Sequence, residues 1–319
     1  MAVRREWGSL NKAERRAYID AVHCMINSPS QFPNGVVPGA KTRFDDFTAI
    51  HINITNSIHL SGIFLSWHRN FVWIWETASR EECGYPGYQP YWNWALWCDD
   101  LESSLLFDGS DTSNSSNGLF YNSSCPIQVA NGETLPCGTG GGCVTDGPSA
   151  NLTNNLGPVA FSHVYSGLPA NWTAYNRHCF KRNPSNYISI RYGNQTVVDA
   201  LMNTTTIEAF QNTMSGADIN LGPHGGDHFA IGPAMDDFFA SPQDPAFFLH
   251  HGMVDPTWTL WQDADEERRW EVSGTSTIFN GNSTPNVTLK TVQGGTSYHR
   301  LMRCFANIML DSNSMLYTS

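Results

Sequence analysis

The chain has 319 residues, of which 40% are apolar and only 15% charged, and its formal net charge is −11. This length suits one large domain with a deep core. No run of 18 uncharged apolar residues occurs, so no membrane-spanning helix is predicted, and an acidic balance without a Lys/Arg cluster disfavours nucleic acid and anionic lipid as partners.

The first third of the chain predicts three successive helices. Asn11 to Met25 is amphipathic and rich in good helix formers. After a loop rich in proline and glycine, a second helix is expected to begin near Asp45, and a third after Ser61, which would be its N-cap. From Ile63 to Trp75 the third helix is apolar nearly all round, which indicates a helix buried at the centre of a bundle.

The remainder of the chain alternates irregular and helical segments. Gln89 to Trp97 is rich in aromatic residues, and residues 108–160 are rich in Gly, Ser, Asn and Pro, which predicts loops joined by disulfides. Helical patterns return from Val197 to Met214 and after Asp244-Pro245, with Asp244 as N-cap and Pro245 as first helical residue. Residues 275–279 and 287–292 favour short strands.

These patterns contain neither a repeat nor a linker. We therefore expect a single, mainly helical domain over residues 1–319, with a few short strands. Its core would span about residues 10–270, with the C-terminal segment packed on it.

Cysteines and glycosylation sequons indicate secretion. The eight cysteines are scattered without a CxxC pair, which favours disulfides of unknown connectivity over a zinc knuckle. Glycans at Asn-x-Ser/Thr triplets would supply the surface solubility that the low charge does not. The triplets begin at Asn53, Asn114, Asn122, Asn151, Asn171, Asn194, Asn203, Asn282 and Asn286. With no signal peptide before the folded-looking sequence, the chain has the pattern of a mature or trimmed form.

Seven of the eleven histidines fall into two windows. They are His51, His59 and His68, and then His224, His228, His250 and His251. The four others stand alone, as expected of surface or structural histidines: His23, His163, His178 and His299.

The spacing within each window predicts which side chains can meet at a metal. On a helix, His224 and His228 stack on one face about 6 Å apart, and His251 from a separate helix would complete a site. Of the adjacent pair, we take His251 as the ligand and His250 as a residue that packs against or supports the ligands.

The first window needs a break in the helix. His59 and His68 would lie roughly 13 Å apart along one continuous helix, too far for comfortable joint ligation. We therefore place a break at Ser61-Gly62, with His59 in the loop, His68 in the second turn of the next helix and His51 on the preceding one.

The type of ligand limits the metal. Neither window contains a cysteine, and the Glu-x-x-His sets of di-iron bundles are missing. Two neutral three-histidine sites suit copper, with room for dioxygen between the metals, but imidazole also binds zinc, so zinc remains an alternative.

Three segments resemble motifs of one family. Phe64–Arg69 (FLSWHR) resembles the first copper-site motif of tyrosinases and catechol oxidases, and Pro90–Trp94 (PYWNW) is similar to their PYWDW segment. Asp244–His251 (DPAFFLHH), followed by Asp255, resembles their second copper-site motif, DPxFxxHHxxxD. From about residue 10 to 270, the chain is identified as a member of the type-3 copper polyphenol oxidases, similar to short secreted fungal forms.

The resemblance implies a four-helix bundle that holds two copper ions. One copper would be bound by His51, His59 and His68, and the other by His224, His228 and His251. Phe247 would pack against the ligand rings, and Asp255 would orient an imidazole by accepting its second N–H.

Departures from the family pattern concern the substrate pocket. Ser57 replaces a cysteine that forms a thioether to a histidine in many fungal members. Gly225 replaces an asparagine that follows the first ligand of the second copper in many tyrosinases, and Ser215 loosely aligns with a glutamate that helps to deprotonate a phenol. Phe238 falls at the gate position over the copper, and Phe229 is expected to line the same pocket.

A further departure is Pro256, which replaces the usual arginine. It would kink its helix beyond Gly252.

These departures predict the reaction. A catechol binds readily as its anion, whereas a monophenol with a pKa near 10 must be deprotonated in the pocket. We therefore expect oxidation of o-diphenols, with o-aminophenols as further candidates, to exceed ortho-hydroxylation of monophenols. A tyrosinase with full monophenol activity, a haemocyanin-like oxygen carrier and a di-zinc hydrolase are the alternatives. The expected partners are O2 and small phenols, and the expected state is a monomer or weak dimer.

Overall fold

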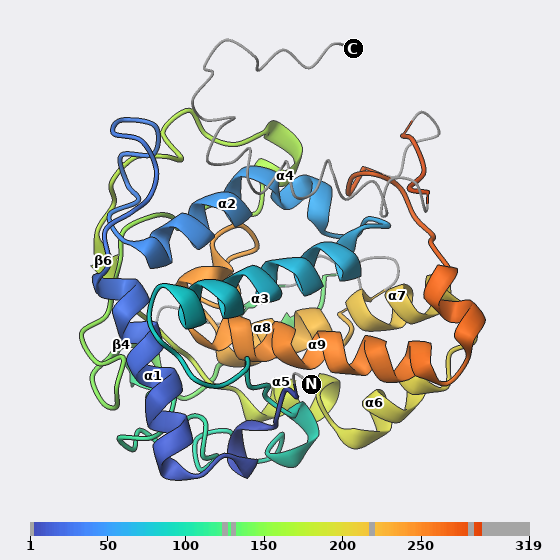
Figure 1. Ribbon diagram of the computed structural model, residues 1–319, viewed down its shortest axis with the longest axis horizontal. Coiled ribbons are helices and arrows are strands. Elements are labelled where there is room, and N and C mark those ends of the chain that lie inside the picture. The colour runs from blue at the N-terminus through green and yellow to red at the C-terminus, as the bar shows by residue number, and fades with distance from the viewer. Residues whose placement is uncertain (1–2, 123–126, 129–131, 217–220, 280–283, 289–319) are drawn as a thin grey trace.

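Four helices form a bundle in the computed structural model, which describes residues 3–122, 127–128, 132–216, 221–279 and 284–288. They are α2 (Arg43–Ile58), α3 (Phe64–Glu81), α8 (Pro223–Ile231) and α9 (Ala246–Asp263). In Figure 1, α3 runs between α2 on one side and α9 on the other, and α8 contacts α9. The predicted mainly helical fold and its four-helix bundle are confirmed.

The N-terminal helix α1 (Lys12–Asn27) covers one end of this bundle. The side chain of Asn11 accepts from the backbone N–H groups of Ala13 and Glu14, and Glu14 bonds back to the Asn11 N–H, so the first turn is capped reciprocally. α1 contacts both α2 and α3, and the Cys24–Cys83 disulfide ties it to the chain after α3. The predicted first helix is confirmed.

The break between α2 and α3 is present, but its capping differs from the prediction. The Ser61 hydroxyl donates to the carbonyl of Ser57 in the preceding helix at 2.8 Å, and Ile63 is the N-cap residue of α3 without a side-chain cap. Leu60, with φ of 47°, reverses the chain between the helices. The Ser61 side chain therefore bonds back to α2 and does not cap α3, so its prediction as N-cap of α3 was wrong.

Helix α9 begins one residue later than expected. Pro245 is the N-cap residue, yet the Asp244 carboxylate still accepts from the Ala246 N–H at 2.8 Å. That carboxylate also pairs with the fully buried Arg182. The helix continues through Pro256 to Asp263.

Shorter helices and strand pairs surround the bundle. The predicted helical segment from Val197 divides into α6 (Gln195–Met202) and α7 (Ile207–Ser215), because Thr206 caps a new helix. The other helices are α4 (His163–Ser166), α5 (Asn186–Tyr192), and the 3-10 turns η1 (Trp7–Ser9), η2 (Trp94–Leu96), η5 (Ser241–Gln243) and η6 (Glu266–Trp270).

The strands are short and pair in twos. Antiparallel pairs join β1 (Gly118–Phe120) to β4 (Gly141–Val144), β2 (Ile127–Gln128) to β3 (Thr134–Leu135), and β5 (Thr153–Asn154) to β6 (His178–Cys179).

Disulfides do join these loops, as expected. The Cys143–Cys179 disulfide links β4 to β6, and Cys137 is also disulfide-bonded. Within the described part of the chain Cys98 is a free thiol, so the expectation of disulfides does not extend to it. Cys125 and Cys304 lie outside the described residues.

The strands predicted after Ser273 do not form as expected. Residues 275–279 contribute only an isolated bridge from Thr275 to Asn286, and residues 287–288 are not in a strand. The rest of the second predicted strand, residues 289–292, lies outside the described residues.

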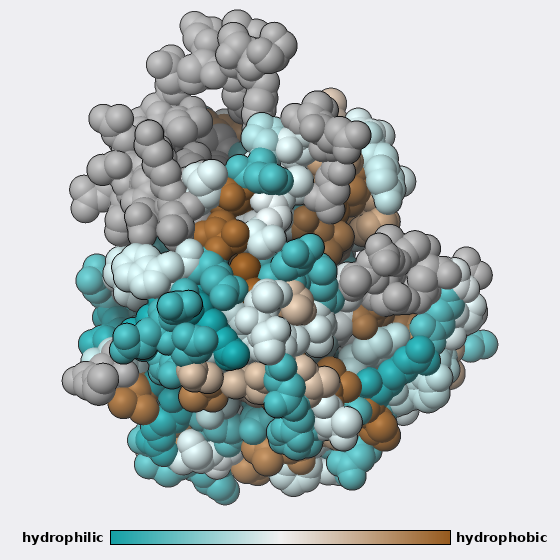
Figure 2. Space-filling model, turned by 90° about the vertical axis from the view of Figure 1, so that its right-hand side faces the viewer, coloured by the Kyte–Doolittle hydropathy of each residue, from teal (hydrophilic) through white to brown (hydrophobic). Residues whose placement is uncertain are grey.

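Apolar side chains are scattered over the face of the molecule that Figure 2 shows. Figure 2 shows one face on which teal and white areas predominate and the brown areas are separate. Among the described residues, no helix has the length and apolarity needed to cross a bilayer. One sequon is sterically blocked in the folded chain, because Asn114 is buried and its side chain accepts from Arg182.

Candidate metal centre

Seven buried histidines form two groups inside the bundle. In each group the nearest ring nitrogens lie within 4.8 Å of one another. The first group is His51, His59 and His68, and the second is His224, His228, His250 and His251. The two groups coincide with the two windows of histidines in the sequence.

The first group comes from three places in the chain. His51 lies on α2, His59 is the C-cap residue of that helix, and His68 lies in the second turn of α3. The end of α2 turns the His59 ring back toward His51, at a centroid distance of 5.0 Å, and the His59–His68 distance is also 5.0 Å. The predicted placement of all three residues agrees with the structure.

Backbone carbonyls fix the orientation of these rings. The Nδ1 atom of His51 donates to the Phe239 carbonyl (2.6 Å), that of His59 to Thr55 (3.0 Å), and that of His68 to Phe64 (2.9 Å). In a neutral imidazole a protonated Nδ1 leaves the lone pair on Nε2. The buried Nε2 atoms of His51 and His68 have no hydrogen-bond partner, as metal ligands require.

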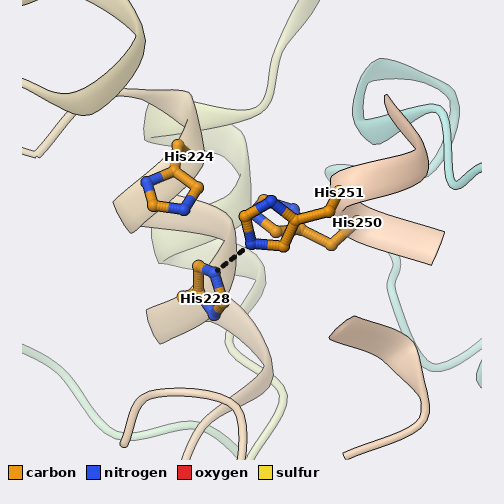
Figure 3. A group of neighbouring side chains, drawn as sticks. All are labelled: His224, His228, His250 and His251. Atoms are coloured by element: carbon orange, nitrogen blue, oxygen red, sulfur yellow. Dashed lines mark hydrogen bonds between the residues drawn. The ribbon is translucent and has the colours of Figure 1, made fainter. Parts of the chain in front are cut away.

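The second group joins α8 to α9. Figure 3 shows His224 and His228 on one helix, with the rings of His250 and His251 approaching from the other. The Nε2 atoms of His228 and His251 lie 3.3 Å apart, and His228 Nδ1 donates to the Met235 carbonyl. Two nitrogens each about 2.0–2.1 Å from one metal in near-tetrahedral geometry are about 3.3 Å apart. The pair therefore fits shared ligation of one ion.

The two groups face each other closely enough to form one dinuclear centre. The rings of His68 and His251 stack with centroids 4.3 Å apart and an interplanar angle of 10°. His59 and His224 also stack, with centroids 6.1 Å apart. A metal bound by each group would thus lie beside the other, which agrees with the predicted pair of ions.

Burial keeps the histidines neutral. It lowers the pKa of His59 to about 3 and that of His228 to about 4, and it lowers the pKa of the other five well below the usual value. Neighbouring imidazoles lower the pKa of every one of these histidines except His228 further, because each would repel a second positive charge. Neutral imidazole is the form that binds a metal, so the site is electrostatically suited to cations.

His250 differs from its neighbours in its hydrogen bond. The indole N–H of Trp94 donates to His250 Nδ1 at 3.0 Å. Nδ1 therefore acts as an acceptor, and the proton of the neutral ring lies on Nε2, which leaves no free lone pair for a metal. The predicted supporting role of His250 fits this geometry.

Aromatic rings enclose the ligand rings. Phe247 lies 4.2 Å from His251 and 5.3 Å from His51 between centroids, so it contacts both groups as predicted. Phe64 lies 4.6 Å from His224 and 4.8 Å from His68, a contact that the sequence analysis did not anticipate. These rings exclude water and hold the imidazoles in place.

Asp255 does not have its predicted role. Its two oxygens accept from Arg4 and Arg69, and neither contacts an imidazole. The Arg69 guanidinium in turn lies over the Trp258 ring at 3.8 Å. Asp255 therefore ties the N-terminal segment and α3 to α9, and the prediction that it orients an imidazole was wrong. Peptide carbonyls orient four of the imidazoles instead, those of His51, His59, His68 and His228.

Asp227 points away from the metal centre. It lies on α8 between His224 and His228, but its carboxylate packs against Gly193 at the end of α5. The contact is so close that a Cβ added to Gly193 would lie 2.7 Å from a carboxylate oxygen. Burial raises its pKa well above the usual value.

The predicted pocket residues lie at one side of the centre. The Phe238 ring is 4.7 Å from the His59 ring, and Gly225 and Phe229 are partly exposed on successive turns of α8. Ser215 is the last residue of α7, and this helix end abuts Gly222, just before His224. The structure therefore places Ser215 near the site, beside the start of α8, and not among the side chains that contact the histidine rings.

Other contributors could not be identified from the sequence. The carbonyls of Phe239 and Met235 carry no side-chain signal, and Trp94 was noted as part of an aromatic segment and of the PYWNW motif, without a role at the site. Phe161, whose ring contacts Phe238 at 5.3 Å, lies in the turn before α4 and follows no recognisable sequence pattern.

Comparisons with known proteins agree with this geometry. The family model described as the common central domain of tyrosinase matches residues 41–264. The chain therefore belongs to the tyrosinase family of dicopper oxidoreductases.

Fungal proteins are among its similar relatives. Tyrosinase P of Aspergillus terreus is 48% identical over 299 residues, which cover 91% of this chain and 83% of the relative. The N-acetyl-6-hydroxytryptophan oxidase ivoB of Emericella nidulans is 40% identical over 310 residues, which cover 91% and 84%. A polyphenol oxidase structure from Thermothelomyces thermophila superposes with a TM-score of 0.82 at 39% identity, covering 90% of this chain and 80% of that one.

Proposed function

We propose that the protein oxidises o-diphenols, with o-aminophenols as a second substrate class, to o-quinones or their imine analogues. Monophenol hydroxylation would be the slower activity. Overall, two catechols deliver four electrons and four protons to one O2, which gives two quinones and two waters. The observation that carries this proposal is the combination of a six-imidazole centre with Gly225 and Ser215 at its edge.

The metal ligands follow from the ring nitrogens. One copper would be held by His51, His59 and His68, and the other by His224, His228 and His251. His250 is left out because the indole N–H of Trp94 occupies its Nδ1 lone pair. Bound copper would supply the two-electron redox chemistry with O2, while the protein supplies neutral, buried ligands enclosed by aromatic rings.

Gly225 and Ser215 support the preference for diphenols. Neither residue offers a basic group, because glycine lacks a side chain and a serine hydroxyl is not a base at neutral pH. A Cβ on Gly225 would meet only the flexible end of the Leu221 side chain, at 3.0 Å. The position thus has space for a side chain that could help to orient a water or phenol.

Oxygen uptake tests the proposal. The copper-loaded protein is supplied with catechol or with a matched monophenol such as 4-methylphenol, and initial rates are compared. Catechol should react faster, without the lag that marks monophenol hydroxylation. Faster initial turnover of the monophenol would support full tyrosinase activity instead, and reversible O2 binding without catechol turnover would support an oxygen carrier.

Substitution at the pocket edge provides the matched variant. Gly225→Asn should raise the monophenol-to-diphenol rate ratio by about 2- to 12-fold, because the amide can orient a water or phenol through one hydrogen bond, which is worth about 0.5–1.5 kcal/mol. Leu221→Ala, which alters the neighbouring side chain without adding an amide, is the control. An unchanged ratio in Gly225→Asn would contradict the role assigned to this position.

We also propose that the protein is secreted. The Cys24–Cys83 and Cys143–Cys179 disulfides support this, since such bonds persist in oxidising compartments. Material recovered from culture medium should shift in mass on deglycosylation, and recovery from the reducing cytosol alone would contradict the proposal.

A further inference from the structure

A series of aromatic rings leads outward from the metal centre to the surface. The Phe238 ring lies 4.7 Å from His59, Phe161 lies 5.3 Å from Phe238 in an edge-on arrangement, and Tyr165 lies 6.4 Å from Phe161. The outer two side chains are 47% and 74% exposed. We call Phe161 and Tyr165 the aromatic shelf.

The shelf is anchored to the helix that carries the metal ligands. Both residues flank Val164, which is buried, and the Asn56 side chain on α2 donates to the Val164 carbonyl at 3.1 Å. The Val164 N–H in turn donates to the Phe161 carbonyl at 2.9 Å. The backbone under the shelf is therefore fixed relative to His59, so little backbone ordering is needed when a ligand binds.

Exposed aromatic rings of this kind have a distinct binding chemistry. Such rings prefer edge-to-face or offset contacts with another ring, at centroid distances of 4.5–7 Å. Each such contact adds binding energy beyond the area it buries. The hydroxyl of Tyr165 adds one polar group at the outer end, suited to a hydroxyl or carbonyl on the ligand.

Distances define the size of the ligand that could use both sites. The Phe161 ring lies at most about 10 Å from the His59 ring, as the two centroid distances of 4.7 and 5.3 Å require. A second ring that is attached directly or through a few atoms to a phenol bound at the metal centre can therefore reach the shelf.

We propose that the aromatic shelf selects phenols that carry a second aromatic ring. Phe161 and Tyr165 contact that second ring while the phenolic ring occupies the space beside His59 and Phe238. This inference rests on the proposed oxidation of o-diphenols, because it assigns the phenolic ring to the metal centre. Phe161 and Tyr165 are specificity-determining residues and take no part in electron transfer.

A pair of substrates that differ only in the second ring tests the shelf. KM and kcat of the copper-loaded enzyme are measured for catechol and 4-phenylcatechol. Phe161→Ala should raise KM for 4-phenylcatechol by about 3- to 10-fold while changing that for catechol by less than 2-fold, as expected for the loss of one ring contact. Tyr165→Ala should act in the same direction, and Phe161→Tyr, which keeps the ring, should stay near wild type.

The control variant is Tyr121→Ala, which removes a 54% exposed aromatic ring next to β1. It should change neither KM, and thermal denaturation of each variant shows whether the fold is retained. Equal changes for both substrates in Phe161→Ala, or no change for either, would overturn the proposal.

A binding measurement separates this proposal from the proposed activity. Isothermal titration of the copper-loaded protein with 4-phenylbenzoate and benzoate, which are not oxidised, should show tighter binding of the two-ring ligand and loss of that difference in Phe161→Ala. If catechol is not turned over but this difference persists, the activity is wrong and the shelf stands. If catechol is turned over and the two ligands bind equally, the shelf is wrong.

Discussion

Acidification should destabilise the metal-free protein strongly. Burial lowers the pKa of all seven buried histidines, so the folded chain keeps them neutral, whereas in the unfolded chain each binds a proton below about pH 6.5. Their contribution to stability is therefore complete above about pH 6.5 and is lost as pH falls toward the folded-state values.

The size of the loss follows from proton binding. When the pH falls from 7.5 to 5.5, each buried histidine lowers the free energy of unfolding by about 1.4 kcal/mol, so the seven together lower it by about 10 kcal/mol. Asp227 and Asp236 act in the opposite direction because burial raises their pKa values, that of Asp236 to about 7. If each of these two carboxyl groups takes up one proton on folding over the two pH units, the free energy of unfolding regains at most about 5 kcal/mol in total. The histidines dominate, and the net loss of about 5 kcal/mol or more is comparable with the whole stability of a domain.

Urea denaturation of the chelator-treated protein at pH 7.5, 6.5 and 5.5 measures this loss. His250→Gln, which removes one buried imidazole, should reduce the pH dependence by about 1.4 kcal/mol over the same range. Copper-loaded protein serves as the comparison, because bound metal keeps the ligands unprotonated and should retain more stability at pH 5.5. A free energy of unfolding that stays constant or rises as pH falls would refute the reasoning.

Three further substitutions test contacts away from the metal ligands. Asp255→Asn should lower the free energy of unfolding by about 1–3 kcal/mol, because Arg4 and Arg69 lose a charged partner, while copper affinity measured by chelator competition stays unchanged. Arg182→Met should cost about 3–5 kcal/mol by leaving a buried carboxylate without its partner, and the loss should shrink when that carboxylate is also replaced by an amide.

Asp236→Asn should stabilise the protein by about 1–3 kcal/mol at pH 8 and by much less at pH 4. The folded chain holds the Asp236 proton up to about pH 7, so the wild type loses stability as pH rises past the unfolded value, which the amide avoids. Equal stabilities at pH 8 would contradict this. Persistence of full stability in Asp255→Asn or Arg182→Met, measured by urea titration, would equally contradict the contacts assigned there.

The metal centre can be predicted well from the sequence, because the positions of its histidines follow from short spacings along the chain. The four-residue spacing of His224 and His228 is a property of one helix, and the nine-residue spacing of His59 and His68 requires a break that the chain does make. Phe247 follows in the same way, since it lies one turn before His251 on α9.

Errors arose where the deciding partner is far away in the sequence. Asp255 lies one turn after His251, so a bond to an imidazole was reasonable, but Arg4 reaches it from 251 residues away. Ser61 has the side chain of an N-cap residue, yet the chain reversal at Leu60 directs its hydroxyl to the preceding helix. The contact between Phe161 and Phe238 spans 77 positions and depends on the folding of an irregular region.

The carbonyl acceptors of the ligand imidazoles have a consequence for the evolution of this protein. The acceptors are the main-chain carbonyls of Thr55, Phe64, Met235 and Phe239. A substitution at any of these four positions keeps the acceptor, because the main-chain oxygen is present whichever side chain the residue carries. An Asp or Glu acceptor would instead be lost by a single substitution. The scaffold can therefore drift in sequence while the imidazole tautomers are inherited unchanged.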